Sequence, residues 1–265
     1  MRKSTSAVQQ LGLAVDLRPR KLDRNGQRRG GARKNAGRPQ HVRGPGTKEP
    51  HQKRKRVRKD NPLHVVLRTV SELGSFRNRT VLAAIRAATF MATRYEETFR
   101  IVEYSIQDNH IHLLVEAQDQ KTLAAGMKAF ESSCSKRVNA YVSKARGYAR
   151  RRRGSVFRDR YFATELATPK QLRNTLAYIL NNWRKHQADR TTQWQVDLYS
   201  SALTFAGWSE RNGAALAEDA RVKAALPKGY DSLITSAPRT YLIRVLWKRH
   251  HPLISFFEVP GGGSE

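Results

Sequence analysis

The sequence predicts an α+β fold, in which an antiparallel sheet packs against helices, and three observations support it. Stretches rich in β-branched residues, such as 62–70, alternate with stretches whose apolar residues recur at the helical period. Two β-type stretches, 98–107 and 110–117, are separated only by Asp108-Asn109, which predicts a hairpin. One helical stretch precedes this hairpin and another follows it. The expected order is therefore β-α-β-β-α-β, the ferredoxin-like pattern.

The elements follow from their residues in chain order. Residues 62–70, PLHVVLRTV, predict a strand, and residues 77–95 carry apolar side chains at a helical spacing. The hairpin at 98–107 and 110–117 comes next, and residues 121–145 then predict a long helix. The apolar stripe of this helix consists of Leu123, Met127, Phe130, Cys134 and Val138.

A further helix follows the fourth extended stretch, which is expected at 155–167. Thr168 can cap this helix, Pro169 suits its first turn, and Gln171 completes a Thr-x-x-Gln capping box. The helix is expected to run to about His186. Its apolar stripe consists of Leu172, Leu176, Ile179 and Trp183.

Composition divides the chain into three regions. Residues 1–60 hold 19 Lys and Arg but only 4 Asp and Glu, and this segment is expected to be a disordered basic DNA-binding arm. Residues 61–190 are expected to form the α+β domain with its added helix. Residues 191–265 predict a small helical extension of two or three short helices, one of them within 238–251.

The charge of the chain indicates a polyanionic partner, with nucleic acid as the leading candidate. The 265 residues carry a formal net charge of +28. Cys134 is the single cysteine, so an internal disulfide and a thiolate zinc site are excluded, and a small packing residue on a helix is expected there. No apolar run is long enough to span a membrane, and the first residues lack the basic, apolar and small-residue pattern of a signal peptide. A cytoplasmic protein is expected.

Two histidines stand one residue apart in the strand predicted at 110–117. His110 and His112 share one face of that strand, where two imidazoles can hold one divalent cation. Asp108, Asn109 or Glu116 lies near if an oxygen ligand is needed. Alternatively, the pair consists of two surface histidines on the open side of a sheet, which the spacing alone slightly favours.

Polar side chains run along the added helix beside its apolar stripe: Asn174, Tyr178, Asn182 and Lys185. Tyr178 and Asn182 are four residues apart and therefore neighbours on the helix surface. A tyrosine can act as a nucleophile when a cation or basic groups nearby stabilise the phenolate. Alternatively, Tyr178 is an interface aromatic with its hydroxyl in water.

Two motifs together resemble the single-tyrosine HUH transposases, in particular the REP-associated, IS200-like tyrosine transposases of bacteria. DNHIHLLVE resembles the family's Asn-His-hydrophobic-His strand, and LAYILNNWRKH resembles its Tyr-Ile-x-x-Asn helix. The resemblance covers about residues 62–187. It implies that His110 and His112 bind a divalent metal, Mg²⁺ or Mn²⁺, that Asn182 completes or supports this site, and that Tyr178 is the nucleophile.

The resemblance also implies an activity. The protein would be a metal-dependent single-strand DNA endonuclease and strand transferase that forms a 5′-phosphotyrosine link and acts on hairpin-associated repeat DNA near the bacterial nucleoid. No nucleotide cofactor is expected, and the sequence has no P-loop. Tyr178 could serve its own histidines or those of a second subunit in a homodimer, and both arrangements stay open.

The basic residues expected to contact DNA are Arg150, Arg151, Arg152, Arg153, Arg158 and Lys185. A solvated basic loop is an equally good interpretation of the arginines. A different class of function is a non-catalytic nucleic-acid binder that uses the sheet as a platform, since this fold hosts many functions. The strands lack the central aromatic pairs of such a platform. Tyr141, Tyr148 and Tyr161 are the rival candidates for the nucleophile.

Overall fold

The computed structural model describes residues 56–231 and 234–261, which belong to one compact unit, Lys48–Glu265. The basic arm expected at 1–60 lies outside the described residues, except for its last five. Within those five, Val57 is buried in the core of the domain. The packed region therefore extends at least to Val57, a few residues before the boundary expected at 60.

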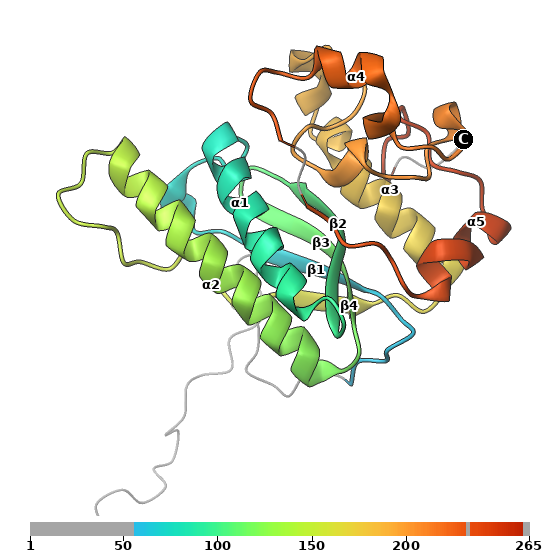
Figure 1. Ribbon diagram of the computed structural model, residues 1–265, viewed down its shortest axis with the longest axis horizontal. Coiled ribbons are helices and arrows are strands. Elements are labelled where there is room, and N and C mark those ends of the chain that lie inside the picture. The colour runs from blue at the N-terminus through green and yellow to red at the C-terminus, as the bar shows by residue number, and fades with distance from the viewer. Residues whose placement is uncertain (1–55, 232–233, 262–265) are drawn as a thin grey trace, which may run out of the picture. The chain divides into compact units, whose positions relative to one another are not determined.

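Four strands form one sheet, and every neighbouring pair is antiparallel (Figure 1). The strands are β1 (Leu63–Arg68), β2 (Phe99–Ile106), β3 (His110–Ala117) and β4 (Phe162–Glu165), and their spatial order is β2-β3-β1-β4. The predicted ferredoxin-like pattern is confirmed. β4 is shorter than the extended stretch expected at 155–167, since the residues before it make one isolated bridge, between Thr69 and Phe157.

Helices α1 (Arg79–Ala92) and α2 (Gln120–Ala145) cover one face of the sheet (Figure 1). Asn78 caps α1 and Asp119 caps α2, each through a side-chain oxygen that accepts a backbone N–H. The apolar stripe predicted for α2 is buried along its whole length. From the sheet, Ile111, Leu113 and Val115 of β3 join this first core.

Two residues of α2 show how tightly this core is packed. A Cβ at Gly126 would overlap the ring of Phe99, so a side chain there would force the helix away from β2. Cys134 is fully buried, and burial raises the pKa of its thiol to about 12. Its thiol therefore stays protonated, as expected for a packing residue.

Helix α3 (Pro169–Lys185) lies on the opposite face of the sheet (Figure 1). The predicted capping box is present: Thr168 Oγ1 accepts from the backbone N–H of Gln171, whose side chain reaches back to the N–H of Thr168. The predicted stripe is buried too, and Leu172, Leu176 and Ile179 pack with Leu114 of β3 in a second core.

The C-terminal residues complete this second core. They contain α4 (Ala220–Ala225), a π-helical turn (Leu242–Leu246) and α5 (Trp247–His250), joined by short 3₁₀ turns. The large buried side chains that they contribute are Phe205, Trp208, Trp247 and Phe256. The extension is therefore part of the folded unit. None of the helices in the described ranges is long and apolar enough to cross a membrane.

Two contacts fasten the extension to the sheet. At the edge of β2, the backbone N–H of Ile106 donates to the carbonyl of Tyr199 at 2.8 Å, which occupies hydrogen-bonding groups that a free edge would expose. At the other end, the carboxylate of Glu116 accepts from Arg100 Nε at 2.7 Å and from the backbone N–H of Thr240 at 2.8 Å.

The expectation of an open sheet face is wrong. The face that carries His112 is covered by α3, and His112 is only 3% exposed. The apolar stripe of α3 was visible in the sequence. The sequence did not show that the C-terminal segment would pack with α3 over this face of the sheet.

Candidate active site

His110 and His112 lie on the face of β3 that meets α3. Ile111 between them points into the first core, because side chains alternate along a strand. The two imidazole centroids are 4.5 Å apart, and the two Nε2 atoms are 2.8 Å apart. The structure thus brings together the two histidines that the spacing placed on one face.

A third imidazole, that of His64, reaches the pair from β1. Leu63 and Val65 are buried in the first core, so His64 between them points to the other face. Its Nε2 lies 3.1 Å from Nδ1 of His112. The sequence analysis missed His64, although its alternate position in the strand at 62–70 was a usable signal.

Hydrogen bonds hold the ring nitrogens that do not face each other. Nδ1 of His110 donates to Oδ1 of Asn109 at 2.6 Å, and Nδ1 of His112 faces His64. A ligating histidine commonly has its second nitrogen held in this way, which fixes the orientation of the ring. Both members of the His-x-His pair are therefore oriented by a neighbour.

Burial keeps these imidazoles neutral near pH 7. For His64, burial and then the charge of His110 lower the pKa to about 4. For His110, burial and then the charges of His186 and Arg68 lower the pKa to about 4. For His112, burial and then the other histidines lower the pKa to about 2. Neutral imidazole is the form that binds a metal ion.

Tyr178 of α3 lies directly beside the histidines. Its ring centroid is 5.1 Å from that of His112 and 6.1 Å from that of His64, with an edge-to-face arrangement in both cases. Nζ of Lys185 is 5.7 Å from the centre of the same ring. An ammonium group at this position favours a developing phenolate and attracts phosphate.

The other tyrosines lie elsewhere. Tyr161 is buried in the first core, Tyr141 is half-buried against it, and Tyr148 is exposed on the loop after α2. Of these four, Tyr178 is the one that contacts the histidine rings.

Asn182 lies one turn after Tyr178 and is fully buried. The row of polar side chains expected along this helix is therefore not exposed at Asn182. Neither Oδ1 nor Nδ2 of Asn182 has a hydrogen-bond partner within the described ranges, so the amide makes no hydrogen bond to His110 or His112. A buried amide without a partner is uncommon and costs free energy, which leaves this group available to a ligand.

The two histidines fit a divalent cation. Two nitrogen ligands of one ion lie at most two bond lengths apart, which is about 4.2 Å for bonds of about 2.1 Å. The Nε2 atoms of His110 and His112 are 2.8 Å apart and are therefore within this limit. Glu116 is not available as a third ligand because its carboxylate binds Arg100 and Thr240. In the described part of the chain, no three His, Cys, Asp or Glu side chains are arranged as a metal site. The unpaired amide of Asn182, one turn after Tyr178, is a candidate for a further ligand.

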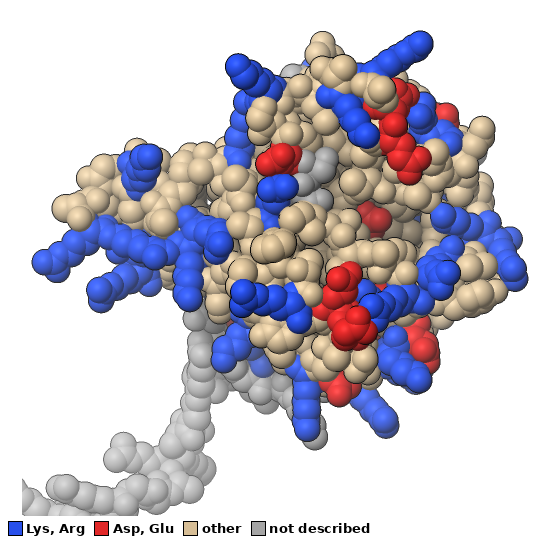
Figure 2. Space-filling view, in the orientation of Figure 1, with Lys and Arg blue, Asp and Glu red and all other residues tan. Residues whose placement is uncertain are grey.

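The basic residues predicted to contact DNA fall in two places. Lys185 lies beside Tyr178, whereas the arginines lie on the loop between α2 and β4. In Figure 2, basic side chains gather on the projecting end formed by α2 and this loop. Arg152 is occupied, since it donates to Asn139 Oδ1 at 2.7 Å and pairs with Glu72. The exposed members are Arg150, Arg151, Arg153 and Arg158.

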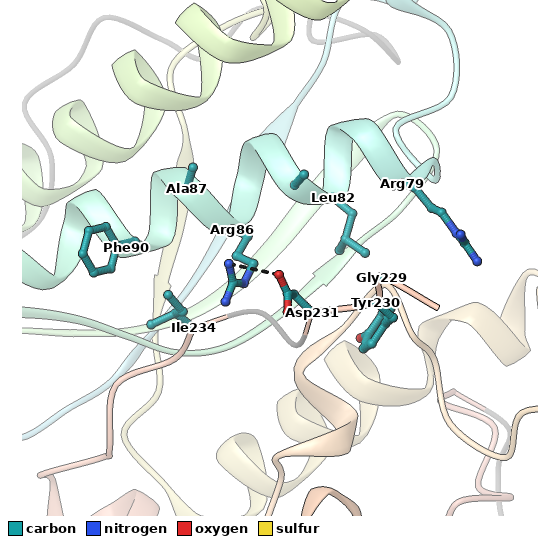
Figure 3. Close-up of a pocket in the computed structure, with 10 residues that line it drawn as sticks. Arg79, Leu82, Arg86, Ala87, Phe90, Gly229, Tyr230, Asp231 and Ile234 are labelled. Carbon is teal, nitrogen blue, oxygen red and sulfur yellow. Dashed lines mark ion pairs between the residues drawn. The ribbon is translucent and has the colours of Figure 1, made fainter. Parts of the chain in front are cut away.

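A cavity of about 450 Å³ lies away from the histidines, on the outer side of α1 (Figure 3). Arg79, Arg86 and Phe90 of α1 line it, together with Tyr230 and Asp231 of the C-terminal segment. The ion pair between Arg86 and Asp231, at 3.4 Å, crosses it. Neither Tyr178 nor any histidine lines this cavity.

Comparison with known proteins gives one family match. Residues 59–182 match the family described as "Transposase IS200 like", a segment that contains His110, His112, Tyr178 and Asn182. No curated protein matches the chain.

Two solved structures are similar to the chain. One is a REP-associated tyrosine transposase bound to a REP hairpin, which is 15% identical, with 71% of this chain and 100% of that chain covered and a TM-score of 0.42. The other is a candidate transposase from Deinococcus radiodurans R1, which is 12% identical, with 53% of this chain and 98% of that chain covered and a TM-score of 0.33.

Proposed function

Because residues 59–182 belong to the family of IS200-like transposases, we propose that this protein cuts and rejoins single-stranded DNA with Tyr178 as its nucleophile. The observation that carries the proposal is the position of the Tyr178 ring, 5.1 Å from His112, whose Nε2 is 2.8 Å from that of His110. A phenol and a pair of neutral imidazoles thus meet within the matched segment.

In the proposed reaction, the phenol oxygen of Tyr178 attacks the phosphorus of the scissile phosphate. A bond from this oxygen to phosphorus forms, and the bond from phosphorus to the 3′ oxygen breaks. The phenol proton ends on the released 3′-hydroxyl, and the 5′ side stays linked to the tyrosine. Because the covalent link conserves the bond energy, a 3′-hydroxyl can reverse the reaction without a nucleotide cofactor.

His110 and His112 would hold a divalent cation, with Asn182 as a supporting amide. When bound, this cation supplies Lewis-acid polarisation of the scissile phosphate. Imidazole ligands suit transition metals better than Mg²⁺, so Mn²⁺ is the better fit of the two expected ions. Lys185 would stabilise the charge that develops on the tyrosine oxygen and the phosphate.

The proposed substrate is a single strand beside a hairpin. An unpaired strand can reach a nucleophile on a helix that is packed against a sheet, whereas base-paired DNA presents its phosphates on a stiff cylinder. The net charge of +28 supports backbone contacts with both parts of such a substrate. Arg150, Arg151 and Arg153 are candidates for these contacts.

The competing function, a sheet that serves as a nucleic-acid platform, has little support. Such a platform needs one open sheet face on which bases can stack. Here α1 and α2 cover one face, and α3 with the C-terminal segment covers the other (Figure 1).

The test is cleavage of labelled single strands taken from the DNA that flanks the gene. Wild-type protein with Mn²⁺ should cut the strand, and Tyr178→Phe should bind it with similar affinity without cutting. Tyr148→Phe is the matched control, because Tyr148 is exposed on the loop after α2, and it should cut normally. Cleavage by Tyr178→Phe would refute the proposed nucleophile.

Metal dependence is tested in the same assay. EDTA should abolish cleavage, and added Mn²⁺ should restore it. His110→Gln should lower cleavage strongly while the far-UV circular dichroism stays unchanged, since His110 is the less buried member of the pair. Full activity in EDTA would exclude a role for the cation.

A further inference from the structure

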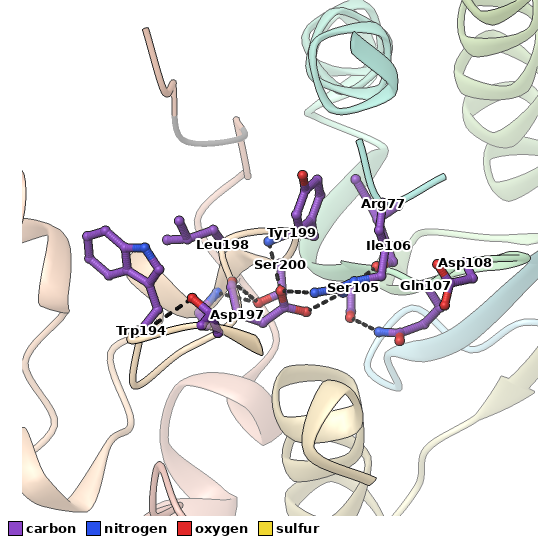
Figure 4. A network of polar contacts seen from close by, with 12 residues as sticks. Arg77, Ser105, Ile106, Gln107, Asp108, Trp194, Asp197, Leu198, Tyr199 and Ser200 are labelled. Atoms are coloured by element: carbon purple, nitrogen blue, oxygen red, sulfur yellow. Dashed lines mark hydrogen bonds and ion pairs between the residues drawn. The ribbon is translucent and has the colours of Figure 1, made fainter. Parts of the chain in front are cut away.

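A second cavity, of about 250 Å³, lies where the C-terminal segment meets the end of α3. Trp183 and Ala188 line it from the α3 side, and Arg77 lines it from the segment before α1. The residues 192–199 form the rest of the wall, which includes Trp194 and Tyr199. Figure 4 shows Trp194, Leu198 and Tyr199 on the segment that faces Arg77. Residues beyond the family match therefore build much of this cavity.

The cavity lies at the C-terminal end of the helix that carries Tyr178. Trp183 follows Tyr178 by five residues on α3, which is about 7.5 Å along the helix axis and about 140° around it, so the two side chains point to different sides of the helix. On the other side, Arg77 donates to the carbonyl of Ile106 at 2.9 Å, and Ile106 ends the strand that turns into His110. A strand bound at Tyr178 would reach the cavity by passing around the end of α3.

The chemistry of the wall suits a neutral, planar group. Arg77 is the cationic side chain of the lining, and both of its terminal nitrogens donate to the carboxylate of Asp197, at 2.8 and 2.9 Å. This pairing leaves no net positive charge for a phosphate. The Arg77 guanidinium also stacks over the ring of Tyr199, with 4.8 Å to its centroid. The rest of the lining is uncharged and includes the aromatic side chains of Trp183, Trp194 and Tyr199.

One donor in this wall has no partner. Trp183 is 1% exposed, and its Nε1 makes no hydrogen bond to any residue that the structure describes. A buried indole N–H normally finds an acceptor. Bases carry such acceptors on their edges, and their faces stack on aromatic side chains. The volume is also below the range of about 300–1,000 Å³ that larger ligands need.

We propose that this cavity binds one unpaired base of the single strand whose phosphate Tyr178 attacks; the base stacks on Trp194 and accepts a hydrogen bond from Trp183. This inference rests on the proposed single-strand function. It adds a contact made outside the matched transposase segment, and it explains why residues 192–199 are fixed against the domain by the Arg77–Asp197 pair.

The test measures equilibrium binding in EDTA, with full-length protein that carries Tyr178→Phe, so that cleavage plays no part. Two fluorescent single strands of equal length serve as probes: one of mixed sequence with all four bases, and one that is abasic throughout. Both carry the same phosphates. Fluorescence anisotropy gives the Kd for each, and circular dichroism verifies that every variant is folded.

Trp194→Ala should weaken binding of the base-containing strand at least about fivefold, because removal of a stacking aromatic costs about 1–3 kcal/mol and 1.4 kcal/mol is a factor of ten. Binding of the abasic strand should stay within about twofold. Trp194→Phe should keep most of the affinity, because a ring remains. Phe90→Ala is the matched control: it removes an exposed aromatic from the cavity outside α1 and should change neither affinity.

Three results would overturn the inference or its premise. Equal weakening for both strands in Trp194→Ala would assign Trp194 to backbone contacts or to folding. Unchanged affinity for the base-containing strand would show that no base binds there, and it would leave the proposed cleavage activity standing. If the protein binds neither strand, the single-strand function itself fails.

Discussion

His112 is the residue around which the candidate site is organised, because each of its ring nitrogens faces another imidazole. Nδ1 of His110 donates to Asn109, so Nε2 of His110 has a lone pair and accepts from Nε2 of His112. Nδ1 of His112 then accepts from His64. If both Nε2 atoms bind a cation, the ring hydrogen of His112 must move from Nε2 to Nδ1. Nε2 of His64 must then accept a hydrogen bond from this Nδ1–H group.

His64→Leu should therefore weaken metal binding. Without His64, the Nδ1–H of His112 would be buried without an acceptor, and loss of such a partner typically costs 10–100-fold in metal affinity. Isothermal titration with Mn²⁺ measures the change. His64→Gln keeps an acceptor and should recover part of the affinity, whereas His250→Leu, at an exposed histidine, should have no effect. An unchanged Mn²⁺ affinity in His64→Leu would contradict this role.

The same histidines should make stability depend on pH. In the unfolded chain these histidines have a pKa near 6.5, whereas in the folded chain the pKa values of His64 and His110 are lowered to about 4. Above pH 6.5 both states are neutral and stability is unaffected. As the pH falls below 6.5, the unfolded state takes up more protons, so the free energy of unfolding decreases.

Urea denaturation at pH 7.5 and pH 5.5 tests this expectation. The wild-type protein should lose stability between the two values, and a His64→Leu variant should lose less because one of the three groups is gone. A His64→Leu variant that loses as much stability as the wild type would show that the pKa of His64 is not lowered in the folded protein.

At the scale of elements, much of the site could be predicted from short stretches of sequence. The capping box and the apolar stripe of α3 are local signals, and they predicted both the existence and the start of the helix that carries Tyr178. Alternation in β3 placed His110 and His112 together. The contact of His64 with His112 depends on how β1 pairs with β3, which joins residues far apart in the chain. No local pattern reveals such a register.

The burial of Asn182 and the cover over the sheet were also beyond local patterns. Both depend on how α3 packs against the sheet, and the C-terminal segment adds to this cover with turns that are short and lack a clear period. This segment packs into the second core through large side chains scattered among these turns, and polar contacts such as those of Glu116 add to its attachment. A carboxylate in a strand that also carries metal-binding candidates looked like a ligand, whereas its partners are Arg100 and Thr240.

Glu116→Ala should destabilise the protein strongly. Glu116 is 1% exposed and Arg100 is 9% exposed, so the substitution would leave a buried guanidinium without its carboxylate. Loss of one partner of a buried ion pair costs about 3–5 kcal/mol. Guanidinium denaturation measures the loss. Glu116→Gln retains an oxygen for the backbone N–H of Thr240 and should lose less; a cost below about 1 kcal/mol for Glu116→Ala would contradict a structural role.

At the scale of the whole molecule, the chain combines a folded domain with a strongly charged N-terminal region. Residues 1–55 carry 16 Lys and Arg and 3 Asp and Glu, whereas Val57 already belongs to the core. A truncation that begins at Arg56 therefore removes charge without opening the core. The proposed role of this region is contact with DNA phosphates.

This truncation should weaken DNA binding and flatten its dependence on salt. Each lost phosphate contact on a single strand should reduce the slope of log Kd against log salt concentration by about 0.7. Anisotropy titrations at several salt concentrations give this slope. Cleavage at saturating DNA should continue, because Tyr178 and the histidines remain. An unchanged slope would show that residues 1–55 make no phosphate contacts.

The central claim is that Tyr178 forms the covalent link to DNA, and mass spectrometry of the trapped adduct tests it most directly. Trypsin should release residues 174–184, NTLAYILNNWR, in which Tyr178 is the single tyrosine. The account predicts that the nucleotide is attached to this peptide and that Tyr178→Phe forms no adduct. A nucleotide on Tyr141, Tyr148 or Tyr161, or an adduct in Tyr178→Phe, would contradict it.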